Sequence, residues 1–190
     1  MIEYAAAAAI GYGLGALPLA YLVARRHGVD LRRTSDGNPG AWNALEQLGA
    51  RRAWPAFVGD GAKGLLAGLI GHLLGDWWTA WAGVAGAMAG HAMPPFAGKA
   101  VMCFVGGAFA LSPAAAAACG LLCLGVTARW GFAQGARAGV AAFPVAQLVT
   151  DPVSHVAGTG VLMTFIGALF LLRRDMSGRA SAGRDARPTT

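Results

Sequence analysis

A loop between the first two long apolar runs carries residues that could bind an anion. It reads Arg32-Arg33-Thr34-Ser35-Asp36-Gly37-Asn38-Pro39-Gly40-Ala41-Trp42-Asn43. Glycine lets backbone N–H groups converge on an anion, and the arginine pair adds positive charge. The loop therefore suits a phosphate group. The same residues are also typical of an ordinary Asn/Gly/Pro turn flanked by arginines, and this loop alone favours that second interpretation.

A pair of opposite charges follows, inside the next apolar run. Asp60 and Lys63 are spaced so that they meet on one face of a helix. Ionisable groups in an apolar span are costly, and they usually face a partner or a polar cavity. The pair is interpreted equally well as part of a site or as an ion pair that only stabilises the end of the helix.

A third motif reads Gly90-His91-Ala92-Met93-Pro94-Pro95-Phe96-Ala97-Gly98-Lys99. His91 could act as a general base or a hydrogen-bond donor, and Lys99 could hold a phosphate. A single histidine is more often structural, and we assign His72 to packing or an interface. The three motifs come from separate runs, and together they could form one anion site.

Composition indicates the environment in which these motifs lie. The 190 residues are 56% hydrophobic and 13% charged, whereas soluble domains carry about 25% charged residues. A lipid-facing surface removes this conflict, so we expect an all-α, polytopic transmembrane helical bundle. The 29 glycines would let its helices approach closely. The net charge of +6 does not indicate nucleic acid, because the basic residues lie between apolar runs.

Seven apolar runs predict about seven spans: Ile2–Ala24, Ala53–Gly75, Trp77–Ala97, Ala100–Ser112, Ala114–Ala128, Ala138–Thr150 and Val153–Leu172. A helix needs about 20 residues to cross the hydrocarbon core, a length that the first three runs and the last one reach. The fourth and fifth runs are two short helices, a tilted pair or a re-entrant hairpin. The sixth has room to extend back toward Gly131, which would bring Arg137 into or near the protein interior.

Charge predicts the orientation of these spans, because short cytoplasmic loops are enriched in Lys and Arg. With the N-terminus outside and the C-terminus cytoplasmic, every Lys and Arg except Lys63 lies on the cytoplasmic side, and Glu3, Asp76 and Asp151 lie outside. We read Ile2–Ala24 as a retained span, not a cleaved signal. Residues 1–175 are expected to form one transmembrane domain, and residues 176–190 a disordered basic cytoplasmic tail.

The three motifs resemble those of the bacterial acyl-phosphate:glycerol-3-phosphate acyltransferases, the PlsY family. That family carries a first-loop motif S-G-N-[IP]-G-A-T-N, here Asp36 to Asn43. It also carries D-x-x-K-G, here Asp60, Lys63 and Gly64, and then G-H-x-x-P before a Gly/Lys-rich loop, here Gly90, His91, Pro94 and Gly98-Lys99. Order and spacing agree over roughly residues 10 to 110.

The resemblance implies an activity and a location. It implies transfer of a fatty acyl group from acyl phosphate to glycerol 3-phosphate, or to another small phosphorylated acceptor, to make lysophosphatidate in phospholipid biosynthesis. The site would face the cytoplasm from a multi-pass protein of the bacterial inner membrane, in contact with membrane lipid. Acyl phosphate is already activated, so the protein need mainly align an alcohol with the carbonyl and stabilise developing charge. No cofactor and no metal are expected.

The resemblance also names candidate residues. The catalytic candidates are Ser35, Asp36 and His91. The candidates for binding substrate or phosphate, or for shaping that site, are Arg33, Gly37, Asn38, Gly40, Asn43, Asp60, Lys63 and Lys99.

The chain departs from the family pattern at several positions. Asp36 stands where the family has Ser, unless Ser35 fills that place, and Glu46 stands where the family has Arg. A Ser-rich motif is replaced by Arg129-Trp130-Gly131-Phe132, and a C-terminal H-x-x-N-I motif by Arg173-Arg174-Asp175-Met176. The alternative hypothesis is therefore a catalytically degenerate paralogue that binds lipid or a partner protein. A small transporter ranks last, because the outer half of the spans offers mainly His72 and Asp76.

Overall fold

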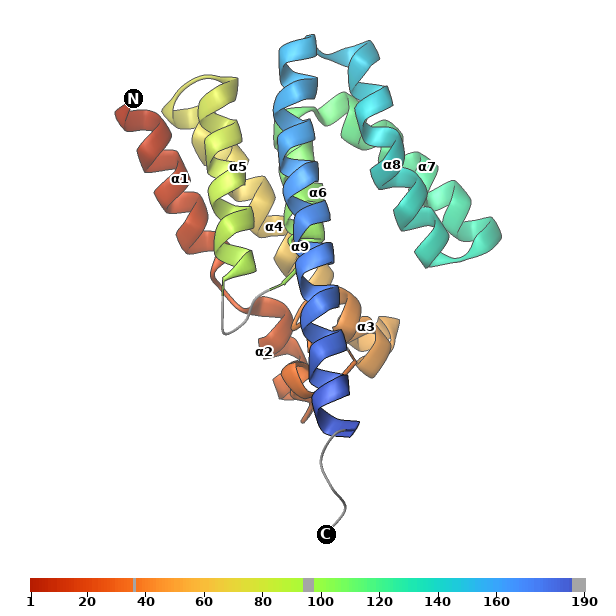
Figure 1. Cartoon of the computed structure of the whole chain (residues 1–190). Helices are drawn as coiled ribbons and strands as arrows, with labels where there is room; N and C mark the ends of the chain where they lie inside the picture. The colour runs from red at the N-terminus through yellow and green to blue at the C-terminus, as the bar shows by residue number, and fades with distance from the viewer. Residues whose placement is uncertain (36, 94–97, 186–190) are drawn as a thin grey trace.

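The chain is helical throughout the part that the structure describes. The computed structural model describes residues 1–35, 37–93 and 98–185, with 173–185 as backbone alone, and no β-strand occurs in these ranges. The elements are α1 (Ile2–Gly15), α2 (Leu19–Arg26), the 3-10 helix η1 (Leu31–Arg33), α3 (Ala41–Leu48), α4 (Ala50–Leu74), α5 (Trp77–Ala92), α6 (Val101–Leu111), α7 (Pro113–Trp130), α8 (Phe132–Thr150) and α9 (Val153–Asp185) (Figure 1). The predicted all-α class is confirmed.

Three helical stretches in the described ranges are long and apolar enough to cross a membrane. They are Ile2–Arg26, Pro113–Trp130 and Val153–Leu172, and Val101–Leu111 is a shorter apolar helix. The third predicted run is shorter than expected, because α5 ends at Ala92 and Met93 has extended backbone. A residue that precedes a proline, as Met93 does, disfavours helical backbone. The count of seven spans stays a prediction.

The region between Lys99 and Arg129 forms two separate helices. Of the three arrangements that the sequence left open, α6 and α7 are a short helix and a longer one, joined at Ser112 and the proline that opens α7. Proline is well placed at the first position of a helix, where its missing N–H costs no hydrogen bond. The next helix, α8, starts at Phe132, so the predicted extension toward Gly131 is confirmed. Arg137, expected in or near the protein interior, is exposed.

Close glycine contacts join α1, α4, α5 and α6. A β-carbon on Gly64 of α4 would overlap the carbonyl of Cys103 on α6, and one on Gly106 would overlap the carbonyl of Gly61. A β-carbon on Gly11 of α1 would likewise overlap the carbonyl of Gly83 on α5. Helices that approach this closely gain van der Waals contact along their backbones, which is the main attraction available between helices in lipid.

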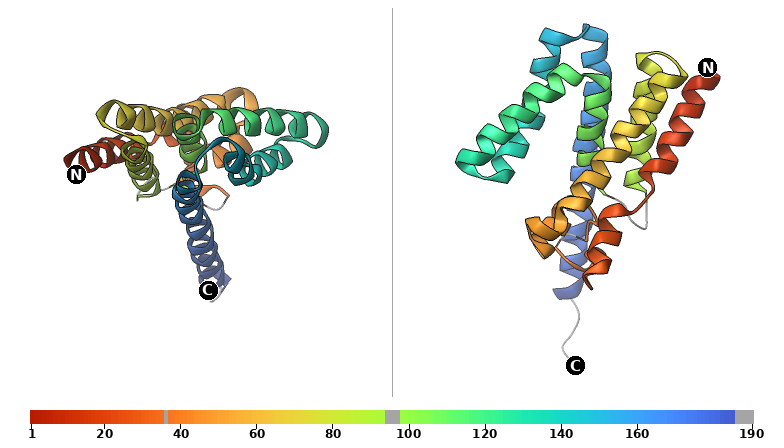
Figure 2. Two further views of the ribbon diagram at one scale, coloured as in Figure 1. Left: turned by 90° about the horizontal axis from the view of Figure 1, so that it is seen from above. Right: turned by 180° about the vertical axis from the view of Figure 1, so that it is seen from behind.

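The helices form two groups joined by a cap. In Figures 1 and 2, the hairpin of α7 and α8 leans away from the group formed by α1, α4 and α5. At one end of that group, α2, η1 and α3 pack on the start of α4 through a small apolar core that includes Leu31, Ala44 and Ala53. We call α2, η1, the loop 34–40 and α3 the cap.

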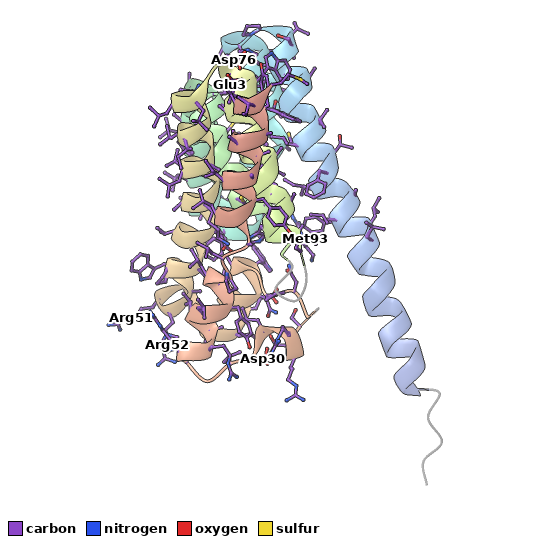
Figure 3. The ribbon with its side chains drawn as sticks, turned by 90° about the vertical axis from the view of Figure 1, so that its left-hand side faces the viewer. Glu3, Asp30, Arg51, Arg52, Asp76 and Met93 are labelled. Carbon is purple, nitrogen blue, oxygen red and sulfur yellow. The ribbon has the colours of Figure 1, made fainter. Side chains whose placement is uncertain are left out.

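The basic residues labelled in Figure 3 lie at one end of the long axis of the molecule, whereas labelled acidic residues lie at both ends. Arg51, Arg52 and Asp30 lie at the cap end, whereas Glu3 and Asp76 lie at the opposite end (Figure 3). At that opposite end Asp76 caps α5 by accepting hydrogen bonds from the Thr79 backbone N–H at 2.9 Å and the Thr79 hydroxyl at 3.0 Å. These bonds lower the pKa of Asp76.

The C-terminal helix does not end where the sequence placed a boundary. α9 continues to Asp185, past residue 175. Residues 186–190 lie outside the described residues, so the disorder expected for 176–190 stays a prediction, as does the single-domain assignment of 1–175. The three cysteines form no disulfide, and Cys103 and Cys119 are buried among helix contacts.

Substituting Gly64 by alanine should destabilise the protein, since the added methyl group must push α4 and α6 apart. Overpacking of this kind costs about 1–3 kcal/mol. The matched control is Gly125→Ala on α7, where a β-carbon meets no atom within 4 Å and where alanine should gain up to about 1 kcal/mol in helix propensity. Thermal unfolding of the two variants in detergent, followed by size-exclusion chromatography, measures the difference. Equal melting temperatures would contradict the close contact.

Candidate functional site

Asn43 holds the cap loop in place. Its side-chain N–H group lies within hydrogen-bond distance of three carbonyls, those of Leu31 at 3.0 Å, Thr34 at 3.2 Å and Asn38 at 2.9 Å. Its Oδ1 accepts a bond from the Thr34 hydroxyl at 3.1 Å. Since Asn43 is 2% exposed, its amide is occupied by the loop. The geometry supports a role in shaping the loop, with Gly37 supplying a positive φ of 71° at the turn.

A second set of hydrogen bonds fixes Glu46 at the rim of the same loop. Ser35 donates its hydroxyl to Oε2 of Glu46 at 3.0 Å, and the Trp42 indole N–H donates to Oε1 at 2.7 Å. Both carboxylate oxygens thus have donors. Glu46 stands at the position of the family's arginine, and in this chain its charge is compensated by hydrogen bonds from two neighbours.

Trp42 also connects the cap to the α7–α8 hairpin. Its ring stacks on that of Phe132 with centroids 5.8 Å apart, and Phe57 meets Phe132 edge-on at 5.6 Å. Trp42, Glu46 and Phe132 all lie at positions where the sequence departs from the family motifs. The structure shows that these departures contact one another, which the linear sequence did not reveal.

Asp60, Lys63 and His91 form a buried polar cluster where α4 and α5 meet the break between α1 and α2. The Lys63 ammonium lies 2.9 Å from Oδ1 of Asp60 and 3.2 Å from Nδ1 of His91. It also donates to the carbonyl of Leu17 at 2.6 Å and approaches that of Gly15 at 3.4 Å. The predicted contact between Asp60 and Lys63 is confirmed, and the pair is integrated with the histidine of the third motif.

The cluster determines which ring nitrogen of His91 carries the proton. An ammonium group can only donate, so Nδ1 accepts from Lys63 and a neutral His91 carries its proton on Nε2. A β-carbon on Gly98 would overlap that Nε2, so the backbone of Gly98 lies directly beside it. The Gly98 N–H donates to the His91 carbonyl at 2.8 Å, which brings Lys99 back toward the end of α5.

One pocket of about 660 Å³ collects residues from the three motifs. From the cap come Ser35, Asn38, Gly40, Asn43 and Glu46, from α4 and α5 come Asp60 and His91, and Lys99 and Ala100 lie at the start of α6. The rest of the lining is mostly apolar and includes Phe57, Phe132, Val140, Ile166 and Phe170. The pocket therefore has a polar end made by loops and an apolar wall made by α8 and α9.

The lining includes most of the candidates named from the sequence. Lys63 supports the pocket from behind, and Gly37 and Arg33 are exposed on the cap without being part of the lining. Asp36 lies outside the described residues. Lys99 approaches the wall as well, with its ammonium 4.6 Å from the centroid of the Phe170 ring. The functional roles of all these residues stay predictions.

Sequence reasoning missed Arg137 as a lining residue. The signal was available, because extension of α8 toward Gly131 places Arg137 within the helix, but no motif marked it.

On the cap, Arg32 binds Asp30 through two side-chain hydrogen bonds of 3.0 and 2.9 Å, which lower the pKa of Asp30 to about 2. Arg32 is therefore engaged within the cap. The described residues contain no group of three or more His, Cys, Asp or Glu side chains that could hold a metal.

Replacing Lys63 by methionine should destabilise the protein by about 3–5 kcal/mol, since Asp60 would remain charged and buried without its partner. The double variant Asp60→Asn with Lys63→Met should recover part of this loss, because both buried charges are gone. Chemical or thermal unfolding in detergent measures both. A double variant no more stable than the single one would contradict a dominant charge interaction.

Comparisons with known proteins agree with this geometry. A family model described as glycerol-3-phosphate acyltransferase matches residues 5–179. Glycerol-3-phosphate acyltransferase 4 of Dehalococcoides mccartyi is 36% identical over 148 residues, which are 71% of this chain and 61% of that relative. A glycerol-3-phosphate acyltransferase of Neisseria gonorrhoeae is 40% identical over 128 residues, 62% of this chain and 64% of the relative. The chain thus spans less than two thirds of the length of these curated relatives.

Solved structures extend the similarity to nearly the whole chain. The crystal structure of PlsY (YgiH), an integral membrane glycerol 3-phosphate acyltransferase, in its glycerol 3-phosphate form has a TM-score of 0.75 and 28% identity, and the match covers 98% of this chain and 96% of that one. Its lysophosphatidic acid form gives a TM-score of 0.72 and 27% identity with the same coverage. The match of the family model across most of the chain shows that this protein belongs to the glycerol-3-phosphate acyltransferase family.

Proposed function

We propose that this protein is a membrane acyltransferase that moves a fatty acyl group from acyl phosphate to glycerol 3-phosphate, forming lysophosphatidate. The observation that carries the proposal is the single pocket in which Asn38, His91 and Lys99 meet an apolar wall. A small phosphorylated acceptor suits the polar end, and a fatty acyl chain suits the wall. The family membership and the ligands named for the similar crystal structures support these substrates.

The chemistry requires alignment and charge stabilisation. A hydroxyl oxygen of the acceptor attacks the acyl carbonyl carbon, the bond from that carbon to the phosphate oxygen breaks, and phosphate leaves. The hydroxyl proton passes to the departing phosphate or to water. Lys99 would neutralise a phosphate, and fixed N–H donors would stabilise the developing oxyanion. The described residues thus supply binding and orientation around a substrate that is already activated.

His91 would act as a donor in this scheme. Its Nδ1 lies 3.2 Å from the Lys63 ammonium and would accept from it, and in this scheme a proton on Nε2 would be donated to a substrate. Lys63 would be a positioning residue that fixes the ring, and Asn43 would fix the loop that presents Asn38. The catalytic assignments of Ser35 and Asp36 and the binding assignments of Arg33, Gly37 and Gly40 remain part of the proposal.

We further propose that the chain spans a bacterial inner membrane seven times, with the N-terminus outside and the pocket facing the cytoplasm. The support is the position of the labelled basic residues. Arg51 and Arg52 lie at the cap end, where Asp30 also lies, whereas Glu3 and Asp76 lie at the other end without a labelled basic residue (Figure 3). The rule that basic loops stay in the cytoplasm then assigns the cap to that side.

Lysophosphatidate should form when purified protein in liposomes receives acyl phosphate and labelled glycerol 3-phosphate. Lys99→Ala should lower kcat/KM about 100-fold, a loss typical of a charged group that binds substrate in the transition state. The control is Arg51→Ala, which removes a cation from the same end of the molecule without touching the pocket lining. Folded wild-type protein that makes no product would favour the degenerate paralogue, and full activity in Lys99→Ala would remove the role of that lysine.

Thiol labelling tests the orientation separately. In a background with the three native cysteines replaced by alanine, Glu3→Cys should react with an impermeant maleimide added to intact spheroplasts. Arg33→Cys and Lys99→Cys should react only after the membrane is opened, because both lie at the cap end. Labelling of Arg33→Cys and Lys99→Cys from opposite sides of the membrane would exclude a common pocket.

A further inference from the structure

Arg137 is a cation of the pocket that no motif explains. It lies on α8, five residues beyond Phe132 and therefore about 7.5 Å along the helix axis. It lines the pocket from the side that α8 forms, whereas Lys99 enters from the start of α6. Positive charge thus reaches the pocket from two elements that are separate in sequence.

Arg137 has no counterion among the residues whose side chains the structure describes. Within residues 1–35, 37–93 and 98–172, no carboxylate oxygen lies within 4.0 Å of its guanidinium. The two carboxylates among the described lining residues have other partners. Asp60 pairs with Lys63, and Glu46 accepts hydrogen bonds from Ser35 and Trp42. Arg137 is exposed, so its guanidinium is solvated in this structure and is accessible to an anion.

The surroundings of Arg137 suggest which anion it meets. One turn further along α8 lie Val140 and Ala141, and Ile166 and Phe170 of α9 line the same pocket. The loop groups Ser35 and Asn38 lie at the polar end. Arg137 therefore lies on the helix that forms the apolar wall. If the acyl chain of an acyl phosphate packed on this wall, the phosphate of that substrate would lie near Arg137. The guanidinium fork suits a phosphate, to which it can donate two hydrogen bonds.

We propose that Arg137 binds the phosphate of the substrate that carries the acyl chain, and that Lys99 binds the phosphate of the acceptor. This inference rests on the proposed function, in which both substrates are phosphorylated and each needs its charge compensated. It assigns the donor subsite to α8. Glu46 lies at the rim of the loop, and its carboxylate accepts hydrogen bonds from Ser35 and Trp42. These two bonds reduce the repulsion between its negative charge and a bound phosphate.

Arg129 provides a matched comparison within the same hairpin. It lies in the last turn of α7, its guanidinium is 5.3 Å from the centroid of the Trp130 ring, and it does not line the pocket. An arginine that merely marks the cytoplasmic side of a span would resemble Arg129. Substitution of the two residues therefore separates a general effect of charge at the membrane surface from a specific effect on the donor.

The experiment measures the binding of two ligands to four proteins. Wild type, Arg137→Gln, Arg137→Lys and Arg129→Gln are purified in detergent. Each is titrated by thermophoresis with palmitoyl phosphonate, a donor analogue that cannot transfer its acyl group, and with glycerol 3-phosphate. Arg137→Gln should weaken phosphonate binding about tenfold or more, since bonds to charged groups are worth about 1.5–3 kcal/mol. Arg137→Lys should weaken it less, and Arg129→Gln should leave it unchanged.

Steady-state kinetics on the same proteins should separate the effects on the two substrates. In Arg137→Gln, the KM for acyl phosphate should rise and the KM for glycerol 3-phosphate should stay unchanged. Equal phosphonate affinity in wild type and Arg137→Gln would overturn the inference while leaving the proposed function intact. An equal loss in Arg129→Gln would also overturn it, because the effect would then be surface charge. If wild type binds phosphonate but makes no lysophosphatidate, the proposed function fails, and the phosphonate affinities still decide the role of Arg137.

Discussion

The buried charge of Lys63 is the constraint on which the site depends. At 3% exposure, its ammonium is stable only if the protein supplies the partners that water would have supplied. Those partners come from three places: a carboxylate one turn earlier on α4, the ring of His91 on α5, and carbonyls at the break between α1 and α2. Helix α1 ends at Gly15 and α2 begins at Leu19, so the carbonyls of Gly15 and Leu17 lie at a break in the helical ladder and can accept from Lys63. One side chain thus fixes the relative positions of four helices around the pocket.

Glycine makes this arrangement possible. The carbonyls of α4 and α6 approach the opposite backbone so closely that a single methyl group would not fit at Gly64 or Gly106. At Gly98 the same restriction serves the site directly, because any β-carbon would overlap the His91 ring. The chain therefore uses small residues both to pack helices where the hydrophobic effect gives little attraction and to leave room for polar side chains.

Three of the positions that depart from the family pattern, Trp42, Glu46 and Phe132, form a connected set at one corner of the pocket. Trp42 donates to Glu46 and stacks on Phe132, while Ser35 donates to the same carboxylate. An acidic residue in an anion site would be unfavourable in isolation. Here its oxygens are occupied, and the aromatic pair ties the cap to the α7–α8 hairpin. Positive charge reaches the pocket instead from Lys99 and from Arg137 on the hairpin itself.

The sequence by itself determined the helical class, the family and most of the polar residues of the pocket, because these depend on local features. Long apolar runs require helices, and the spacing of Asp60 and Lys63 brings them together on any helix. Asn38, His91 and Lys99 follow the order of the family motifs along the chain, and all three line one pocket in the structure. What the tertiary structure alone decided are the contacts between separate runs. The extent of α5, the link from Lys63 to His91, the compensation of Glu46 and the entry of Arg137 into the lining all depend on how helices far apart in sequence approach each other, and no local pattern encodes that approach.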